Sequence, residues 1–159
     1  MKLLLIRHGK SSWDIPGQPD KARPLAMRGH RQLKELAGLL IQEGFQPDGI
    51  LVSPAVRTLL TAAVLRQGGW GDVTLTQTIN ELYEDSATAI SALIYELVEG
   101  QEFLTIIGHN PWLNELIGLF TGVPVENLKT SGAVLLEFED SKQLKEGKAK
   151  LTWSHRLSY

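Results

Sequence analysis

The chain has 159 residues, of which 43% are hydrophobic and 21% are charged, with a net charge of −2 and no cysteine. This length and composition suit one globular domain over residues 1–159, and the small net charge gives no general attraction to nucleic acid or to an anionic membrane. No disulfide or thiolate site can form. No segment has the length of a membrane span or resembles a signal peptide, so we expect a cytoplasmic location.

Patterns of apolar residues, with Gly and Pro between them, predict an alternation of short strands and helices. In the first half these elements are a strand over 3–6, a loop over 10–24, a helix over 25–43, a strand over 49–52 and a helix over 55–66. In the second half they are a strand over 73–75, a loop over 78–85, a helix from Ser86 to Val98, a strand over 102–107, a helix over 112–120, and strands over 133–138 and 149–153 joined as a hairpin through 145–147. Ser53 and Ser86 are expected to cap the helices that follow them. Strands alternating with helices indicate an α/β fold, a three-layer α/β/α sandwich with a mainly parallel sheet.

Three of the expected strands lead into cationic or reactive side chains. These are Arg7 and His8 after the first strand, Arg57 in the first turn of the helix after the second, and His109 after the strand over 102–107. Ligands bind at the carboxyl ends of strands in open α/β sheets. If these strands are parallel neighbours, the four side chains meet at one edge of the sheet.

Two guanidinium groups and two imidazoles suit a phosphoryl group. Arginine binds phosphate oxygens in a bidentate manner, and one imidazole can attack phosphorus while a second, if protonated, stabilises the developing charge. The four histidines of the chain include no helical i, i+4 pair, and the arginines would repel a cation. We therefore expect neither a metal ion nor another cofactor.

The chain resembles the histidine phosphatase superfamily, whose fold is that of the phosphoglycerate mutases, and within it the SixA-type phosphohistidine phosphatases. The motifs that carry this resemblance are Arg7-His8-Gly9-Lys10-Ser11-Ser12, Arg23-Pro24-Leu25 with Arg28-Gly29, Val52-Ser53-Pro54 with Arg57-Thr58, Glu81-Leu82-Tyr83, and Gly108-His109-Asn110-Pro111. They extend over nearly the whole chain and imply a single histidine-phosphatase domain over 1–159. The resemblance implies that His8 is the nucleophile and that Arg7, Arg57 and His109 complete the phosphate pocket.

Other roles are implied less directly. Glu81 falls where larger members carry the acid that protonates a leaving alkoxide, and Asp14 and Asp20 are competing candidates for that acid. Phosphohistidine has a good leaving group, so an acid matters far more for O-phosphate esters. Arg23 is either a substrate contact or a structural ion-pair partner, and Ser131 is a candidate to face the pocket.

These features favour a metal-independent phosphatase that forms a covalent phosphohistidine at His8 and acts on phosphohistidine of a partner protein. The short stretch between Arg57 and His109 leaves no room for large insertions around a small-molecule pocket. The first alternative is a general phosphomonoesterase acting on a small metabolite or phosphoserine, and the second is a phosphate-binding module without turnover. We expect His8 to be neutral and His109 protonated, which predicts a bell-shaped pH profile. Nothing in the sequence predicts an oligomeric state.

Overall fold

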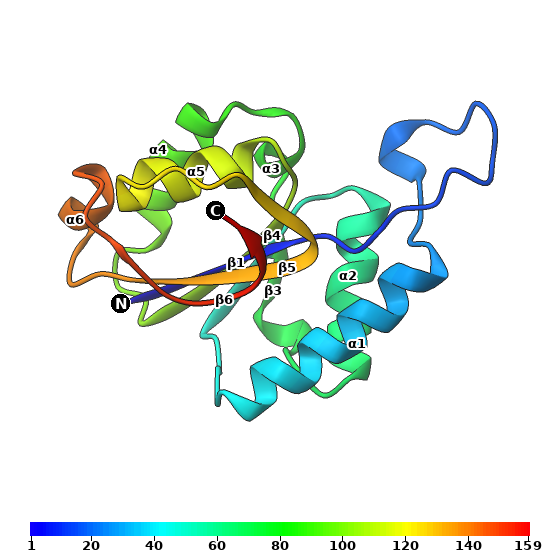
Figure 1. Ribbon diagram of the computed structural model, residues 1–159, viewed down its shortest axis with the longest axis horizontal. Helices are drawn as coiled ribbons and strands as arrows, with labels where there is room; N and C mark the ends of the chain where they lie inside the picture. Colours follow the sequence, from blue (N-terminus) through cyan, green and yellow to red (C-terminus); the bar gives the residue numbers. More distant parts are fainter.

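A computed structural model describes all 159 residues, which form one six-stranded sheet in the order β3-β2-β4-β1-β5-β6 (Figure 1). The strands are β1 (Lys2–Arg7), β2 (Gly49–Val52), β3 (Thr76–Thr78), β4 (Phe103–Gly108), β5 (Asn127–Glu137) and β6 (Lys150–Ser158). The α-helices are α1 (Met27–Gln42), α2 (Val56–Gln67), α3 (Glu81–Glu84), α4 (Ala87–Leu97), α5 (Trp112–Thr121) and α6 (Ser141–Lys145). Short 3-10 turns cover Asp20–Ala22 and Val73–Leu75.

The centre of the sheet is parallel. β4 pairs in parallel with both β1 and β2, and β2 pairs in parallel with β3. β5 and β6 add two antiparallel strands on the other side of β1. The predicted mainly parallel sheet is confirmed, and the three strands that precede the candidate residues are neighbours.

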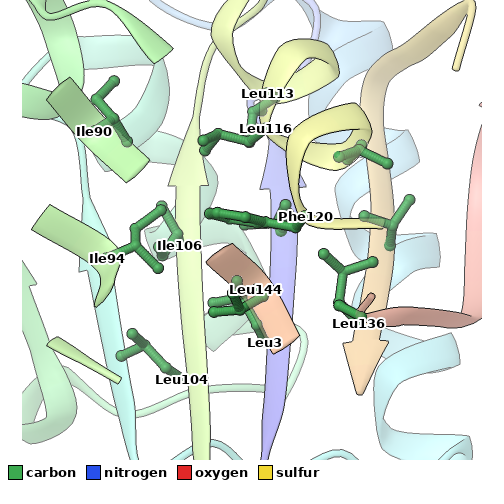
Figure 2. Close-up of a cluster of buried hydrophobic side chains, with 14 of the residues drawn as sticks. Leu3, Ile90, Ile94, Leu104, Ile106, Leu113, Leu116, Phe120, Leu136 and Leu144 are labelled. Atoms are coloured by element: carbon green, nitrogen blue, oxygen red, sulfur yellow. The ribbon is translucent and has the colours of Figure 1, made fainter. Parts of the chain in front are cut away.

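Helices cover both faces of the sheet, because alternate side chains of each central strand point to opposite faces. Leu4 and Ile6 of β1 pack with α1 and α2, whereas Leu3 and Leu5 pack with α4, α5 and α6. Figure 2 shows part of the second cluster, in which Phe120 of α5 lies among side chains of the sheet and of α4. Each fully buried Leu or Ile contributes about 1.5–3 kcal/mol by leaving water. The predicted three-layer α/β/α sandwich is therefore confirmed.

The predicted elements need correction at four places. Residues 73–75 form a 3-10 turn, because the Asp72 carboxylate accepts a hydrogen bond from the Thr74 backbone N–H, and the strand follows at 76–78. The expected loop over 78–85 contains α3, and the connection between β5 and β6 contains α6 rather than a simple hairpin turn. Ser86 does cap α4. Ser53 does not cap α2, since Ala55 occupies the cap position. None of the helices combines the length and the apolar character that crossing a bilayer requires.

Candidate functional site

Backbone pairing brings the ends of β1, β2 and β4 together. Arg7 pairs with Gly108 at the last position of the β1–β4 ladder, and the His8 N–H donates to the Gly108 carbonyl at 3.1 Å. On the other side of β4, the Ser53 N–H donates to the Ile107 carbonyl at 3.2 Å. The rings of His8 and His109 consequently lie side by side, with their centroids 5.2 Å apart. The predicted meeting of these residues at the carboxyl edge of the sheet is observed.

His8 is held with one ring nitrogen available for reaction. Its Nδ1 lies 2.7 Å from the carbonyl oxygen of Gly9, an acceptor only, so Nδ1 carries the hydrogen and Nε2 carries the lone pair. Burial lowers the pKa of His8 to about 4, assisted by the charges of Arg57 and Arg7 and opposed by the bond to Gly9. His8 is thus neutral at physiological pH, as a nucleophile must be.

His109 is held by a residue that the sequence did not indicate for this purpose. Its Nε2 lies 2.7 Å from the Ser53 hydroxyl, whereas its Nδ1 is buried without a partner. Burial, together with the charges of the neighbouring His8 and Arg57, lowers the pKa of His109 to about 3. The expectation that His109 is protonated is therefore wrong for this arrangement. A dianionic phosphoryl group beside the ring would shift its pKa upward.

Three arginines approach the histidines, and each is anchored differently. Arg7 Nη1 donates to the Leu128 carbonyl at 3.0 Å, while its buried Nε has no partner. Arg23 donates to the Ser11 hydroxyl, and its guanidinium stacks 3.3 Å from the ring centre of Trp13. Burial lowers the pKa of both arginines, and the positive charge of Arg57 adds to the effect. Such clustering of cations is costly unless an anion lies among them.

Asp20 supplies, through its carboxylate, a negative charge next to Arg57 and Arg23. Its carboxylate Oδ2 accepts from Arg57 Nη2 at 3.0 Å and from the Tyr83 hydroxyl at 2.8 Å, and Oδ1 lies 3.5 Å from Arg23 Nε. Its backbone carbonyl also accepts from Arg57 Nη1 at 2.9 Å. Burial raises the pKa of Asp20, but the hydrogen bonds from Tyr83 and Arg57 outweigh it and keep the pKa below its usual range. The Asp20 carboxylate therefore accepts hydrogen bonds from Arg57 that a phosphoryl oxygen would otherwise accept.

The other two carboxylates considered as acids lie elsewhere. Glu81 begins α3, is exposed, and makes neither a side-chain hydrogen bond nor an ion pair. Asp14 is likewise exposed and its carboxylate has no partner. A cavity of about 600 Å³ opens beside His109, and its lining includes Asp20, Arg57 and Tyr83 but not His8, Glu81 or Asp14. The structure thus brings Asp20, and not Glu81, into the site.

Ser131, on β5, lies against His8. Its backbone N–H donates to the His8 carbonyl at 3.0 Å, and its buried hydroxyl has no partner. The residue has a φ of 60°, at an irregularity in the pairing of β5 with β6. An irregularity of this kind redirects a side chain out of the regular alternation. The irregularity in β5 thus coincides with the residue whose N–H contacts His8.

Two motif glycines are explained by close approach of other groups. A Cβ on Gly29 would lie 2.6 Å from the Lys10 carbonyl oxygen, so only glycine lets α1 pack against the chain just after His8. A Cβ on Gly108 would lie 2.1 Å from the Trp112 ring. This ring fills the space beneath the turn that leads to His109. Tyr83, whose ring lies 5.8 Å from that of His109, is a further site residue that only its place in a motif suggested.

Comparisons with known proteins identify the family of this chain. Residues 3–96 match the family described as the histidine phosphatase superfamily (branch 1). An uncharacterized chloroplastic protein of Arabidopsis thaliana is 28% identical over 148 residues, which cover 86% of this chain and 66% of the plant protein. The chain thus spans slightly less than two thirds of that relative.

Solved structures share the fold at low sequence identity. The protein histidine phosphatase SixA complexed with tungstate is 22% identical, with a TM-score of 0.84 and coverage of 99% of this chain and 97% of that one. A phosphoserine phosphatase mutant from Entamoeba histolytica, in complex with phosphoserine, is 18% identical, with a TM-score of 0.70 and coverage of 96% and 95%. Because the family match extends over more than half of the sequence, the chain belongs to the histidine phosphatase superfamily.

Proposed function

We propose that residues 1–159 act as one metal-independent phosphatase domain that transfers a phosphoryl group to His8 and then to water. The observation that carries the proposal is the state of His8, which is buried, neutral, and locked with Nε2 free by the bond from Nδ1 to Gly9. We further propose phosphohistidine on a partner protein as the favoured substrate. An open cavity suits a phosphoryl group presented on a protein surface.

In the first step, the Nε2 lone pair of His8 attacks phosphorus and forms a P–N bond. The bond from phosphorus to the substrate nitrogen breaks, and its electron pair remains on the departing imidazole. If the other nitrogen of that ring carries a hydrogen, the group departs as neutral imidazole and needs no acid. This chemistry fits a site in which no carboxylic acid lies next to His8.

The phosphoryl oxygens require donors, and three groups supply them. Arg7 Nε, the His109 Nδ1 and the Ser131 hydroxyl are buried without partners, which is costly unless a ligand satisfies them. The Arg57 guanidinium becomes available when the Asp20 carboxylate withdraws. Each charge-assisted bond to such an oxygen contributes about 1.5–3 kcal/mol. In this proposal, the donors bind the phosphoryl oxygens so that phosphorus faces His8 Nε2.

In the second step, water attacks phosphorus, the P–Nε2 bond breaks, and its electron pair returns to His8. Inorganic phosphate leaves, and the proton of the water passes to a nearby base. Asp20 is the carboxylate that the geometry favours for this transfer, because it already contacts Arg57 and Tyr83 at the cavity. Glu81 remains the candidate inferred from the family, but its exposed side chain makes no hydrogen bond or ion pair with a residue of the site, so the geometry does not support it.

A second candidate function is hydrolysis of O-phosphate monoesters such as phosphoserine or a small metabolite. The likeness in fold to a phosphoserine phosphatase with bound phosphoserine favours it. An alkoxide leaving group needs a proton, so this activity would depend on Asp20 or Glu81 far more than phosphohistidine hydrolysis does.

The experiment compares turnover of a phosphohistidine peptide, a phosphoserine peptide and an aryl phosphate, each measured without added metal in the presence and in the absence of a chelator. We expect kcat/KM to be highest for phosphohistidine and unaffected by the chelator. Equal or faster hydrolysis of the O-phosphates would favour the second candidate. Retention of phosphate binding with no turnover of any of the three would favour the phosphate-binding module.

A further inference from the structure

The loop over residues 12–19 exposes two large apolar side chains beside the site. Trp13 is 72% exposed and Ile15 is 58% exposed. The loop leaves the sheet just after His8 and returns at Asp20, and Figure 1 shows it projecting beyond the rest of the chain. Tryptophan is mostly buried in folded proteins. An exposed tryptophan next to a second exposed apolar residue therefore indicates a contact surface.

Contacts within the loop and with Arg23 hold the loop backbone and the Trp13 ring in place. The Gln18 N–H donates to the Ile15 carbonyl at 3.3 Å, and the Gln18 side chain donates to the Ala22 carbonyl at 3.3 Å. One face of the Trp13 ring covers the Arg23 guanidinium. A partner that packs on this loop would therefore lose little conformational entropy in ordering it.

One wall of the cavity is acidic. Glu84, Asp85 and Glu115 line it, are exposed, and form no ion pair. Carboxylates in this position repel an acidic surface and attract a basic one, and charge complementarity of this kind sets specificity and encounter rate. The cavity thus has an acidic wall, and the 12–19 loop connects to its Asp20 side through Trp13, which stacks on Arg23.

We propose that the 12–19 loop and the acidic wall form a docking surface for the protein substrate. This proposal rests on the proposed function. The fitting partner carries an apolar residue on one side of its phosphohistidine and basic residues on the other. The apolar residue packs against Trp13 and Ile15, and the basic residues face Glu84, Asp85 and Glu115.

The test uses phosphohistidine peptides of equal length that differ only in their flanks. The reference peptide has glycine and serine on both sides of the phosphohistidine. Three further peptides have leucine flanks, lysine flanks or glutamate flanks, and a fifth has leucine on one side and lysine on the other. We expect the combined leucine and lysine flanks to raise kcat/KM about tenfold over the glycine-serine peptide, a difference of about 1.4 kcal/mol. The glutamate flanks should lower it.

Two variants separate the halves of the surface. Ile15→Ser should remove the gain from leucine flanks, measured relative to the glycine-serine peptide in the same variant. Its matched control is Val73→Ser, because Val73 is 66% exposed but precedes β3, at the opposite end of the sheet. Glu84→Gln combined with Asp85→Asn should remove the gain from lysine. The corresponding control is Glu99→Gln combined with Glu102→Gln, just before β4.

The outcomes also separate the docking surface from the proposed function. Hydrolysis of every peptide at the same kcat/KM would overturn the docking surface and leave the phosphatase intact. A leucine gain that survives in Ile15→Ser, or that is lost equally in Val73→Ser, would likewise overturn it. No hydrolysis of any phosphohistidine peptide would overturn both proposals.

Discussion

His8 and His109 are positioned by backbone pairing between neighbouring strands, whereas Asp20 and Arg23 are positioned by side-chain contacts of a segment outside the sheet. The turn after β1 is fixed by the ladder with β4 and by the Ser131 N–H. Asp20 is fixed by its side-chain contacts with Arg57, Tyr83 and Arg23, and its side chain is 52% exposed. The reacting groups are thus rigid, while the carboxylate on the arginine can be displaced without unfolding. The predictions below test this contrast.

The largest effect is expected at the rigid part of the site. His8→Asn removes the nucleophile and should lower kcat for every phosphate substrate by more than about a thousandfold. Thermal unfolding should show that the variant remains folded, and isothermal titration with inorganic phosphate should show that it still binds the anion. Turnover within tenfold of the unsubstituted protein would contradict the assignment.

The buried histidines should also make stability depend on pH. Their pKa values in the fold are about 4 for His8 and about 3 for His109, below the ordinary value of 6.5, so the unfolded chain binds more protons. The free energy of unfolding should fall as pH decreases below that ordinary value, by about 1.4 kcal/mol per pH unit for each such histidine, and level off above it. Urea denaturation across this range measures the slope. The slope should be smaller in His8→Asn, and an unchanged slope in that variant would contradict the assigned pKa.

A smaller loss is expected when His109 loses its partner. Ser53→Ala leaves Nε2 of His109 without the hydroxyl at 2.7 Å, so the ring loses the contact that holds its orientation. We expect kcat to fall about tenfold to a hundredfold, with KM changed less. Ser91→Ala is the matched control, because that buried hydroxyl bonds only within α4. Equal losses in the two variants would indicate a general packing effect.

The smallest effect on phosphate affinity is expected in the displaceable part of the site. Asp20→Asn removes the charge that competes for Arg57, so inhibition by inorganic phosphate should tighten about threefold to fivefold, the size expected for a partly exposed ion pair. Asp14→Asn is the control, since that carboxylate has no partner. Weaker phosphate inhibition in Asp20→Asn would mean that Asp20 supports the pocket instead of competing for it.

The strand-end part of the site could be predicted from the sequence for a physical reason. Apolar runs that end in Arg7-His8 and in Gly108-His109 indicate buried strands and turns, and parallel strands bring such turns to one edge. The fold class and the meeting of these residues follow from local pattern. Ser53 illustrates the limit of that reasoning. Its place before Pro54 favoured a helix cap, but the ladder between β2 and β4 turns its hydroxyl toward His109.

The contacts of the loop segment could not be predicted in the same way. Asp20 meets Arg57 and Tyr83 across 37 and 63 positions of the chain, and no periodicity encodes such contacts. The family motif suggested Glu81 as the acid, whereas the short helix α3 leaves Glu81 exposed and places Tyr83 near His109. The protonation of His109 was also mispredicted, because burial and neighbouring cations are tertiary effects.

The central claim is that a phosphoryl group passes through His8. The most direct measurement is rapid quenching during turnover, followed by mass spectrometry and phosphorus NMR of the peptide that contains this residue. We predict an acid-labile, alkali-stable phosphate on Nε2 of His8 that forms and decays at rates consistent with kcat. Undiminished turnover with no phosphate on His8, or with phosphate on another residue, would contradict the account.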